Sequence, residues 1–363
     1  MFNNTPFVFS FALLLSFPLL FLFAPRFFPP KHVQISLPDE LDDLALFRRA
    51  TLATLHINTD NHHSRLGTTT KSSSLPKPKI AFLFLTNSDL QFAPLWELFF
   101  ANHSTLYNIY IHADPSVKIS PPGGVFQGHF ISSKKTQRGS PTLISAARRL
   151  LATALLDDPL NSYFAVISQH CIPLHSFDFM YNSLFTKPVT ESTRPNSVST
   201  QSLIYRSFIE ILSDEPQLWG RYNARGENVM LPEVPFHRFR VGSQFFILNR
   251  EHALLVIKDR RLWRKFRLPC LNIHSCYPEE HYFPTLLSME DPEGSTHYTL
   301  TRVNWTGSTG GHPHTYQSVE VSPELIRKLR VSNSTYSFMF ARKFSPDCLK
   351  TLLHLAEKVI FRD

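Results

Sequence analysis

The chain has 363 residues, of which 43% are hydrophobic, so it can bury one large core or two smaller ones, and its composition argues against disorder. The formal net charge is +8, but basic and acidic residues are interleaved, which argues against a nucleic-acid-binding protein. A basic balance also suits a protein that handles an anionic diphosphate.

An uncharged apolar segment lies near the N-terminus. Residues 7–23 contain no charged side chain, and their number is at the short limit of the roughly 17–25 residues that span a membrane as a helix. We therefore expect a short cytosolic tail over 1–6, a transmembrane signal anchor over 7–24, a stem over 25–78 and a folded domain over 79–363. A cleaved signal peptide is the alternative, and the lack of Lys or Arg before the segment argues against it.

Two features disagree about which side of a membrane the folded domain occupies. Arg26 and Lys31 follow the apolar segment, and the positive-inside rule favours a cytosolic domain. Asn102, Asn304 and Asn333 each begin an N-glycosylation triplet, which favours the lumen. We expect a glycan on at least one of Asn102 and Asn333, whereas Asn304 borders a candidate sugar-binding residue.

Strands and helices alternate in the first half of the expected domain. Continuous apolar runs at 80–86, 107–114 and 162–168 are typical of strands buried on both faces. Residues 90–100 and 142–156 carry apolar side chains at helical spacing. This alternation predicts an α/β fold with helices on both faces of a sheet.

Polar side chains end the first two predicted strands. Thr86 and Asn87 follow the first strand, and His112 and Asp114 lie at the end of the second. Because ligands of such sheets bind beyond the carboxyl ends of the strands, these residues form a candidate binding site.

The second half of the domain contains longer loops. We expect a Pro-containing loop over 221–235 and a strand that leads into a helix over 242–251. Three further helices are expected over 277–287, 323–330 and 346–360, and a strand that ends in two basic residues over 336–344. Four cysteines are present, and the spacing of Cys270 and Cys276 permits a small disulfide loop, while buried free thiols are equally compatible with the sequence.

Five segments of the chain carry a family resemblance: SQHCIP (168–173), the RYN…MLPEVP segment (221–235), GSQFF…NRE (242–251), CYPEEHYFPT (276–285) and FARKF (340–344). In this order they resemble the core-2/I-branching β-1,6-N-acetylglucosaminyltransferases, most closely the plant branch, from about Lys79 to the C-terminus. The resemblance implies a GT-A-like nucleotide-sugar transferase domain with a mixed central sheet flanked by helices. It also implies an inverting reaction, a type II anchor in the Golgi membrane and a lumenal catalytic domain.

The resemblance assigns the catalytic base to Glu280. An inverting transfer requires a carboxylate that takes the proton from the attacking hydroxyl, and a helix N-terminus favours an ionised carboxylate. Taken without the resemblance, Glu279 and Glu280 are ordinary acidic residues of a first helical turn.

The resemblance also implies residues for the two substrates. A cation near the donor diphosphate stabilises the charge that develops on the leaving nucleotide, which is the role implied for Lys343 and its neighbour Arg342. The donor is expected to be UDP-N-acetylglucosamine, and the acceptor a glycan or glycoprotein hydroxyl. The remaining residues implied for the donor are Thr86, Asn87, Asp114 and Arg138, and those implied for the acceptor are Ser243 and Trp305.

The sequence departs from common donor sites in two ways. No Asp-x-Asp motif follows a predicted strand, so we expect no metal ion and no cofactor besides the nucleotide-sugar donor. The second diphosphate-binding arginine of the family is expected around His312–Tyr316, where this chain has none. Two alternatives follow: an inactive carbohydrate-binding relative, or a glycoside hydrolase, which would need a second carboxylate beside Glu280.

Overall fold

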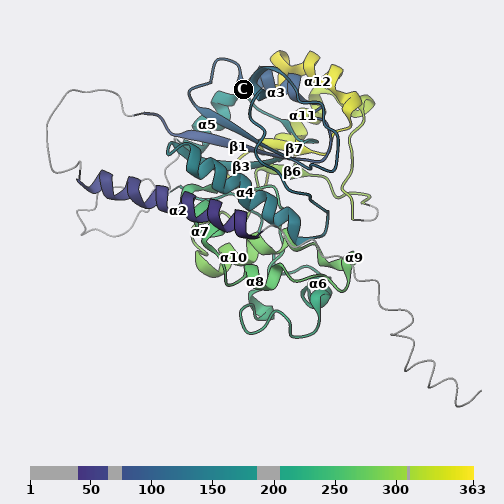
Figure 1. Ribbon diagram of the computed structural model, residues 1–363. Helices are drawn as coiled ribbons and strands as arrows, with labels where there is room; N and C mark the ends of the chain where they lie inside the picture. Colours follow the sequence, from purple (N-terminus) through teal and green to yellow (C-terminus); the bar gives the residue numbers. More distant parts are fainter. Residues whose placement is uncertain (1–39, 64–75, 186–204, 309–310) are drawn as a thin grey trace, which may run out of the picture. The chain divides into compact units, whose positions relative to one another are not determined.

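The computed structural model describes residues 40–63, 76–185, 205–308 and 311–363, all within one compact unit, Pro38–Asp363 (Figure 1). Among these residues, no helix combines the length and the apolar character that crossing a bilayer requires. The segment over 7–24, where the anchor is expected, lies outside the described residues.

The central sheet is mixed, as expected. Its strands are β1 (Lys79–Thr86), β2 (Tyr107–Ala113), β3 (Asn161–Ser168) and β5 (Ile247–Asn249), in the order β2-β1-β3-β5. The first three strands are parallel, and β5 pairs with β3 in the antiparallel direction. The carboxyl ends of β1 and β2 therefore meet at one edge, where the candidate binding residues were expected.

Helices cover both faces of this sheet, which explains why its strands are continuous apolar runs. On β1, Phe82 and Phe84 enter one core, whereas Ala81 and Leu83 enter the other. The first core includes α3 (Ala93–Phe100), α5 (Phe177–Phe185), α11 (Pro323–Arg330) and α12 (Leu349–Leu355), and the second includes α4 (Pro141–Asp157), α7 (Arg250–Lys258), α8 (Trp263–Phe266) and α10 (Tyr282–Glu290).

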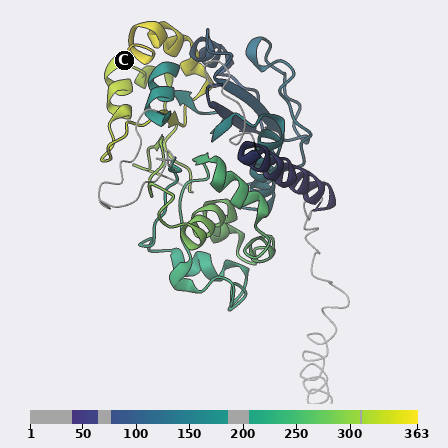
Figure 2. The same ribbon diagram turned by 90° about the vertical axis from the view of Figure 1, so that its left-hand side faces the viewer.

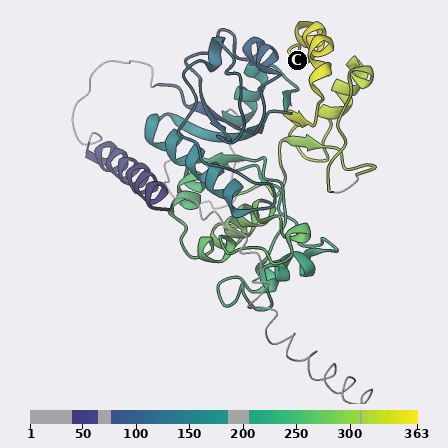
Figure 3. The ribbon, with the colours of Figure 1, turned by 45° about the vertical axis from the view of Figure 1, so that its right-hand side comes forward.

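The unit has two distinguishable ends. In all three views α11 and α12, drawn in yellow, lie at one end, and the green helices of the second core lie toward the other (Figure 1, Figure 2 and Figure 3). The latter end also holds the short helices α6 (Leu218–Tyr222) and α9 (Ile273–Cys276). The segment over 221–235, expected to be a loop, thus begins inside α6.

Helix α2 (Glu40–His63) belongs to the folded unit although it falls within the expected stem. Phe47 and Ala50 are buried in the second core, and Asp43 accepts two hydrogen bonds from Arg149 of α4, at 2.5 and 2.9 Å. The compact unit therefore begins before the boundary expected at Lys79.

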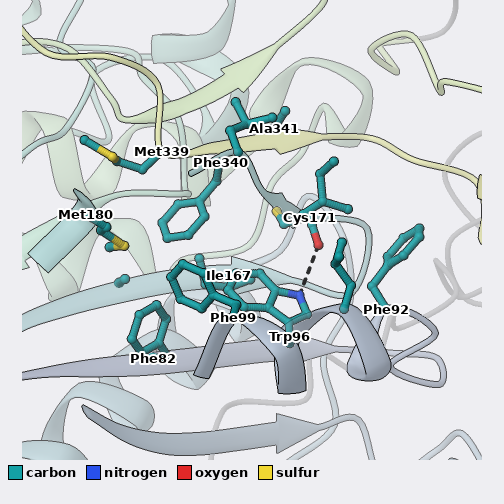
Figure 4. Close-up of a cluster of buried hydrophobic side chains, with 14 of the residues drawn as sticks. Phe82, Phe92, Trp96, Phe99, Ile167, Cys171, Met180, Met339, Phe340 and Ala341 are labelled. Atoms are coloured by element: carbon teal, nitrogen blue, oxygen red, sulfur yellow. Dashed lines mark hydrogen bonds between the residues drawn. The ribbon is translucent and has the colours of Figure 1, made fainter. Parts of the chain in front are cut away.

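A second, smaller sheet carries the basic pair of the C-terminal region. Its strands are β4 (Ile172–Pro173), β7 (Phe340–Arg342) and β6 (Thr301–Val303), with β7 in the middle. Figure 4 shows Phe340 of β7 among the side chains of the first core, where its ring centroid lies 5.7 Å from that of Trp96. Trp96 Nε1 also donates to the backbone oxygen of Cys171 at 3.3 Å. This packing fixes the position of β7 and of the Lys343 that follows it.

The cysteines take both of the forms that the sequence allowed. Cys270 and Cys276 form a disulfide, and Cys171 and Cys348 are buried free thiols. The disulfide closes the loop directly before Tyr277, and this residue leads into the segment that carries Glu279 and Glu280.

Candidate active site

Hydrogen bonds to Asp114 fix the loops at the carboxyl end of β2. Asp114 is buried, and its carboxylate accepts from the backbone N–H and hydroxyl of Ser116 (2.8 and 2.6 Å) and of Thr136 (3.0 and 2.7 Å). Burial raises the pKa of Asp114, but these hydrogen bonds outweigh it and hold the pKa below its usual value. Asp114, expected to contact the donor, is thus engaged in fixing the loop that contains Thr136.

Two further residues of this sheet edge, both at the end of β1, differ in exposure. Thr86 is buried, and its hydroxyl donates to the backbone oxygen of Ser88 at 2.5 Å. Asn87 is exposed, and its side-chain oxygen accepts from Gln169 Nε2 at 2.7 Å. The residue after Gln169, His170, accepts a backbone hydrogen bond from Phe344 at 3.1 Å, so this edge adjoins the end of β7.

A cluster of cations lies beyond that edge. Arg138 Nη2 donates to the backbone oxygen of Gly311 at 2.8 Å, and Nη1 lies 2.6 Å from His312 Nε2. Lys343 Nζ lies 3.4 Å from Nδ1 of the same imidazole. Burial lowers the pKa of His312, and Arg138, Lys343 and Arg342 lower it further, so the ring is neutral between the cations.

The neutral ring of His312 accepts a hydrogen bond at only one nitrogen, and its tautomer decides which one. Arg138 Nη1 lies 2.6 Å from Nε2 and 3.3 Å from Nδ1, and Lys343 Nζ lies 3.4 Å from Nδ1. The ammonium group of Lys343 has three N–H donors, so with either tautomer it keeps donors for an anion. Burial lowers the pKa of Lys343 to about 8, with Arg342 and Arg138 acting in the same direction.

Arg342 occupies a different environment from Lys343. Its guanidinium lies 4.0 Å from the centroid of the Phe245 ring, and its Nε is buried. Burial lowers the pKa of Arg342, and the carboxylate of Glu280 opposes this effect. Arg342 therefore contributes positive charge from a buried position over Phe245, whereas the ammonium group of Lys343 lies beside His312.

The two adjacent acids of the 3₁₀ turn Pro278–Glu280 point in different directions. Glu279 is 3% exposed, whereas the side chain of Glu280 is 30% exposed and accepts a hydrogen bond from Arg221 Nη1 at 2.8 Å. A substrate hydroxyl can reach only a carboxylate that is open to solvent. Of the two acids, Glu280 meets this requirement.

The GSQF segment contacts both Glu280 and Arg342. Gly242 donates its backbone N–H to the Glu280 carbonyl at 2.8 Å, and Phe245, three residues later, lies under Arg342. A Cβ at position 242 would stand 1.9 Å from the backbone oxygen of Glu210, so the close approach requires glycine. Ser243, expected near the acceptor, lies beside this contact, and its hydroxyl accepts from the N–H of Phe245 at 3.1 Å.

Tyr277 joins the two halves of the site. The guanidinium carbons of Arg138 and Arg221 lie 5.5 and 5.4 Å from its ring centroid, within the range of cation–π contacts. Arg221 in turn contacts Glu280. The ring therefore lies between the cation cluster and the proposed base, and a backbone φ of 36° places Tyr277 in the left-handed region.

Trp305 is less closely connected to the rest of the site. Its side chain is 54% exposed. It begins a loop that is closed by a hydrogen bond from His314 N–H to Asn304 O at 2.8 Å, and the far side of that loop contains His312. The described contacts thus place Trp305 on the same loop as His312, which contacts Arg138 and Lys343, without joining its ring to Glu280.

Three residues of the site were given no role from the sequence: Arg221, Tyr277 and His312. The first two lie in the segments that carry the family resemblance, and His312 lies where the second arginine of the family was expected. At that position the structure brings in Arg138 from 174 residues away. No sequence spacing could reveal such a contact.

His312 and His314 contact different partners and do not form a metal site together. His312 contacts Arg138, and His314 pairs with Glu320 at 2.8 Å. Across the described parts of the chain, no group of three or more His, Cys, Asp or Glu side chains is arranged to hold a metal ion. The expectation of metal-independent activity is a separate matter and stays a prediction.

The comparisons with known proteins identify the class of this fold and site. Residues 80–330 match the Core-2/I-Branching enzyme family, and the chain belongs to that family. It is a glycosyltransferase. Among its relatives is Glycosyltransferase BC10 of Oryza sativa subsp. japonica, which is 28% identical over 329 residues, covering 77% of this chain and 76% of the rice protein. The family resemblance inferred from the five segments is thereby confirmed.

Proposed function

We propose that this glycosyltransferase transfers N-acetylglucosamine from UDP-N-acetylglucosamine to a hydroxyl of a glycan or glycoprotein, with inversion and without a metal ion. One observation carries the proposal: contacts connect the solvent-accessible carboxylate of Glu280 to the cation cluster of Arg138 and Lys343. Glu280 accepts from Arg221, and Arg221 and Arg138 both lie over the Tyr277 ring. Arg138 and Lys343 both contact His312. An inverting transfer needs a base on one side of the reacting carbon and charge stabilisation on the other.

The residues divide the reaction between them. Glu280 takes the proton of the acceptor hydroxyl as the hydroxyl oxygen attacks the anomeric carbon. The bond from that carbon to the diphosphate breaks on the opposite face, and the leaving UDP carries the electron pair away. Lys343 and Arg138 stabilise the negative charge that develops on the diphosphate. Arg221 orients the Glu280 carboxylate through their 2.8 Å hydrogen bond.

The nucleoside and the acceptor are assigned to opposite sides of this centre. Thr86 and Asn87, at the carboxyl end of β1, border the nucleoside, and Asp114 shapes that region by holding the loop of Thr136. Ser243 lies beside the Glu280 backbone and borders the acceptor. Trp305 offers an exposed aromatic face on which an acceptor sugar can stack.

The decisive experiment is a screen of UDP-sugars with the purified full-length chain. Release of UDP that depends on an acceptor, with N-acetylglucosamine in the product and the anomeric configuration inverted by NMR, supports the proposal. Transfer of another sugar would correct the donor alone. Release of sugar from an oligosaccharide without use of any UDP-sugar would replace the transferase by a hydrolase, and sugar binding without turnover would indicate an inactive relative.

We predict that transfer continues in excess chelator. The reasons are the missing Asp-x-Asp motif and the presence of Arg138 and Lys343 where a metal ion would otherwise neutralise a diphosphate. Initial rates are compared with EDTA, with manganese and with neither. Complete loss of activity in EDTA that manganese restores would show that the diphosphate is neutralised by a metal.

We further predict a type II Golgi protein, anchored by residues 7–24, with an N-glycan on Asn102 or Asn333. Both asparagines are exposed, whereas Asn304 is partly buried beside Trp305 and its side chain accepts from Thr306 N–H at 3.0 Å. Endoglycosidase treatment of protein from a secretory host should increase its mobility, and Asn102→Gln with Asn333→Gln should remove the shift. An unshifted protein that is digested from the cytosolic side would reverse the topology.

A further inference from the structure

Glu279 is a buried acid beside the proposed base that the mechanism so far leaves without a role. Its Oε1 accepts the backbone N–H of Gly139 at 3.0 Å, and its Oε2 is buried with no hydrogen-bond partner among the described residues. The residue that precedes Gly139 is Arg138 of the cation cluster. A side chain one position from the base therefore holds the backbone one position from a diphosphate-binding cation.

The loop that bears Arg138 is fixed at two points by carboxylates. On one side Thr136 donates twice to Asp114, and on the other Gly139 donates to Glu279. Arg138 lies between these two points, and its side chain is exposed. The two backbone contacts therefore set the position from which this side chain extends. Gly139 has a φ of 69°, a conformation that glycine adopts without strain.

We infer that Glu279 is a positioning residue for the donor: its carboxyl group holds the Gly139 amide and thereby sets Arg138 at a fixed place relative to Glu280. This inference rests on the proposed function, because it assumes that Arg138 binds the diphosphate of a nucleotide sugar. It explains why two consecutive acids face in different directions. Glu280 serves the acceptor side of the reaction, and Glu279 serves the donor side.

The charges around Glu279 identify the suitable substitution. Burial, assisted by the negative charge of Glu280, raises the pKa of Glu279 to about 7. The Gly139 N–H and Arg138 act in the opposite direction. Arg225 is a further cation that interacts with this carboxyl. An ionised carboxylate, a protonated acid and an amide all offer an oxygen to the Gly139 N–H. Glu279→Gln therefore keeps the contact, and Glu279→Met removes it at similar side-chain volume.

The test compares UDP affinity, by calorimetry on the full-length chain, for Glu279→Gln and Glu279→Met. Loss of a buried hydrogen bond is worth about 1–1.5 kcal/mol, so we expect Glu279→Met to weaken UDP binding on the order of tenfold. Glu279→Gln should stay within about twofold of the parent, and the KM for the acceptor should change in neither variant. Glu290→Met, at the exposed far end of α10, is the matched control.

A double-mutant cycle with Arg138→Ala separates positioning from general damage. If Glu279 acts through Arg138, Glu279→Met should weaken UDP binding no further once Arg138 is alanine. A full additional loss in that background, or parental UDP affinity in Glu279→Met, would overturn the inference. If Glu279→Met melts at a much lower temperature, the test falls to Glu279→Gln. Parental UDP affinity and normal melting of Glu279→Gln support the contact, and weakened UDP affinity of a normally melting Glu279→Gln opposes it. A parent chain that binds no UDP would instead overturn the proposed function itself.

Discussion

Glu280→Gln is expected to lower the rate of sugar transfer by roughly 10²–10⁴-fold, while the protein remains folded and binds UDP as before. Glutamine keeps the size of the side chain and an oxygen that can accept from Arg221, but it cannot take up the acceptor proton. The loss should therefore appear in turnover and not in donor affinity. Turnover, UDP binding and thermal melting of the variant provide the three measurements.

Glu290→Gln is the matched control for this substitution. Glu290 is the last residue of α10 and, like Glu280, pairs with an arginine, Arg261, but at the surface and away from the cation cluster. We expect it to leave transfer unchanged. If Glu280 only stabilises the start of α10, its replacement should cost about 0.3–1 kcal/mol of stability with activity retained. Near-normal turnover of Glu280→Gln would mean that another group is the base.

The central sheet could be predicted because its strands are buried on both faces. Each of β1, β2 and β3 is a continuous apolar run, and such runs stand out in a sequence whatever their neighbours are. Strand β7 is shorter than the run expected over 336–344, because only Phe340–Arg342 form the strand, and Phe344 makes an isolated bridge with Tyr316. The packing of α2 on α4 depends on contacts between segments about a hundred residues apart, which local patterns do not encode.

The candidate site likewise contains residues that the sequence could predict and contacts that it could not. The family resemblance implied roles for Glu280, Arg138 and Lys343, and the structure brings these three into one region, although their roles stay predictions. The contacts of Arg221 with Glu280 and of Arg138 with His312 join residues 59 and 174 positions apart, so only the fold reveals them. Asp114 adds contacts that the sequence does not reveal. Four protein donors engage its carboxylate, and its contact with the donor stays a prediction.

Lys343→Ala should raise the barrier to transfer by about 2–4 kcal/mol, which corresponds to roughly 30- to 1,000-fold in rate. The reason is that Lys343 stabilises charge that grows as the diphosphate leaves, so its removal harms the transition state more than the bound donor. Rates with saturating acceptor, and UDP affinity, are measured for both proteins. Lys350→Ala, on the exposed side of α12, is the control that should have no effect. Equal activity of Lys343→Ala and the parent would make Lys343 a solvated surface residue.

The pH dependence offers an independent check on the charge of Lys343. Its pKa of about 8 in the free enzyme means that the ammonium form is present below that pH and is lost as the pH rises through it. Because kcat/KM reports groups of the free enzyme, kcat/KM for the donor should decline above about pH 8. The bound diphosphate favours the ammonium form, so the decline of kcat should come at higher pH. Lys343→Arg keeps a positive charge throughout this range and should shift the alkaline decline of kcat/KM upward. An alkaline limb that is unchanged in Lys343→Arg would assign the titration to another group.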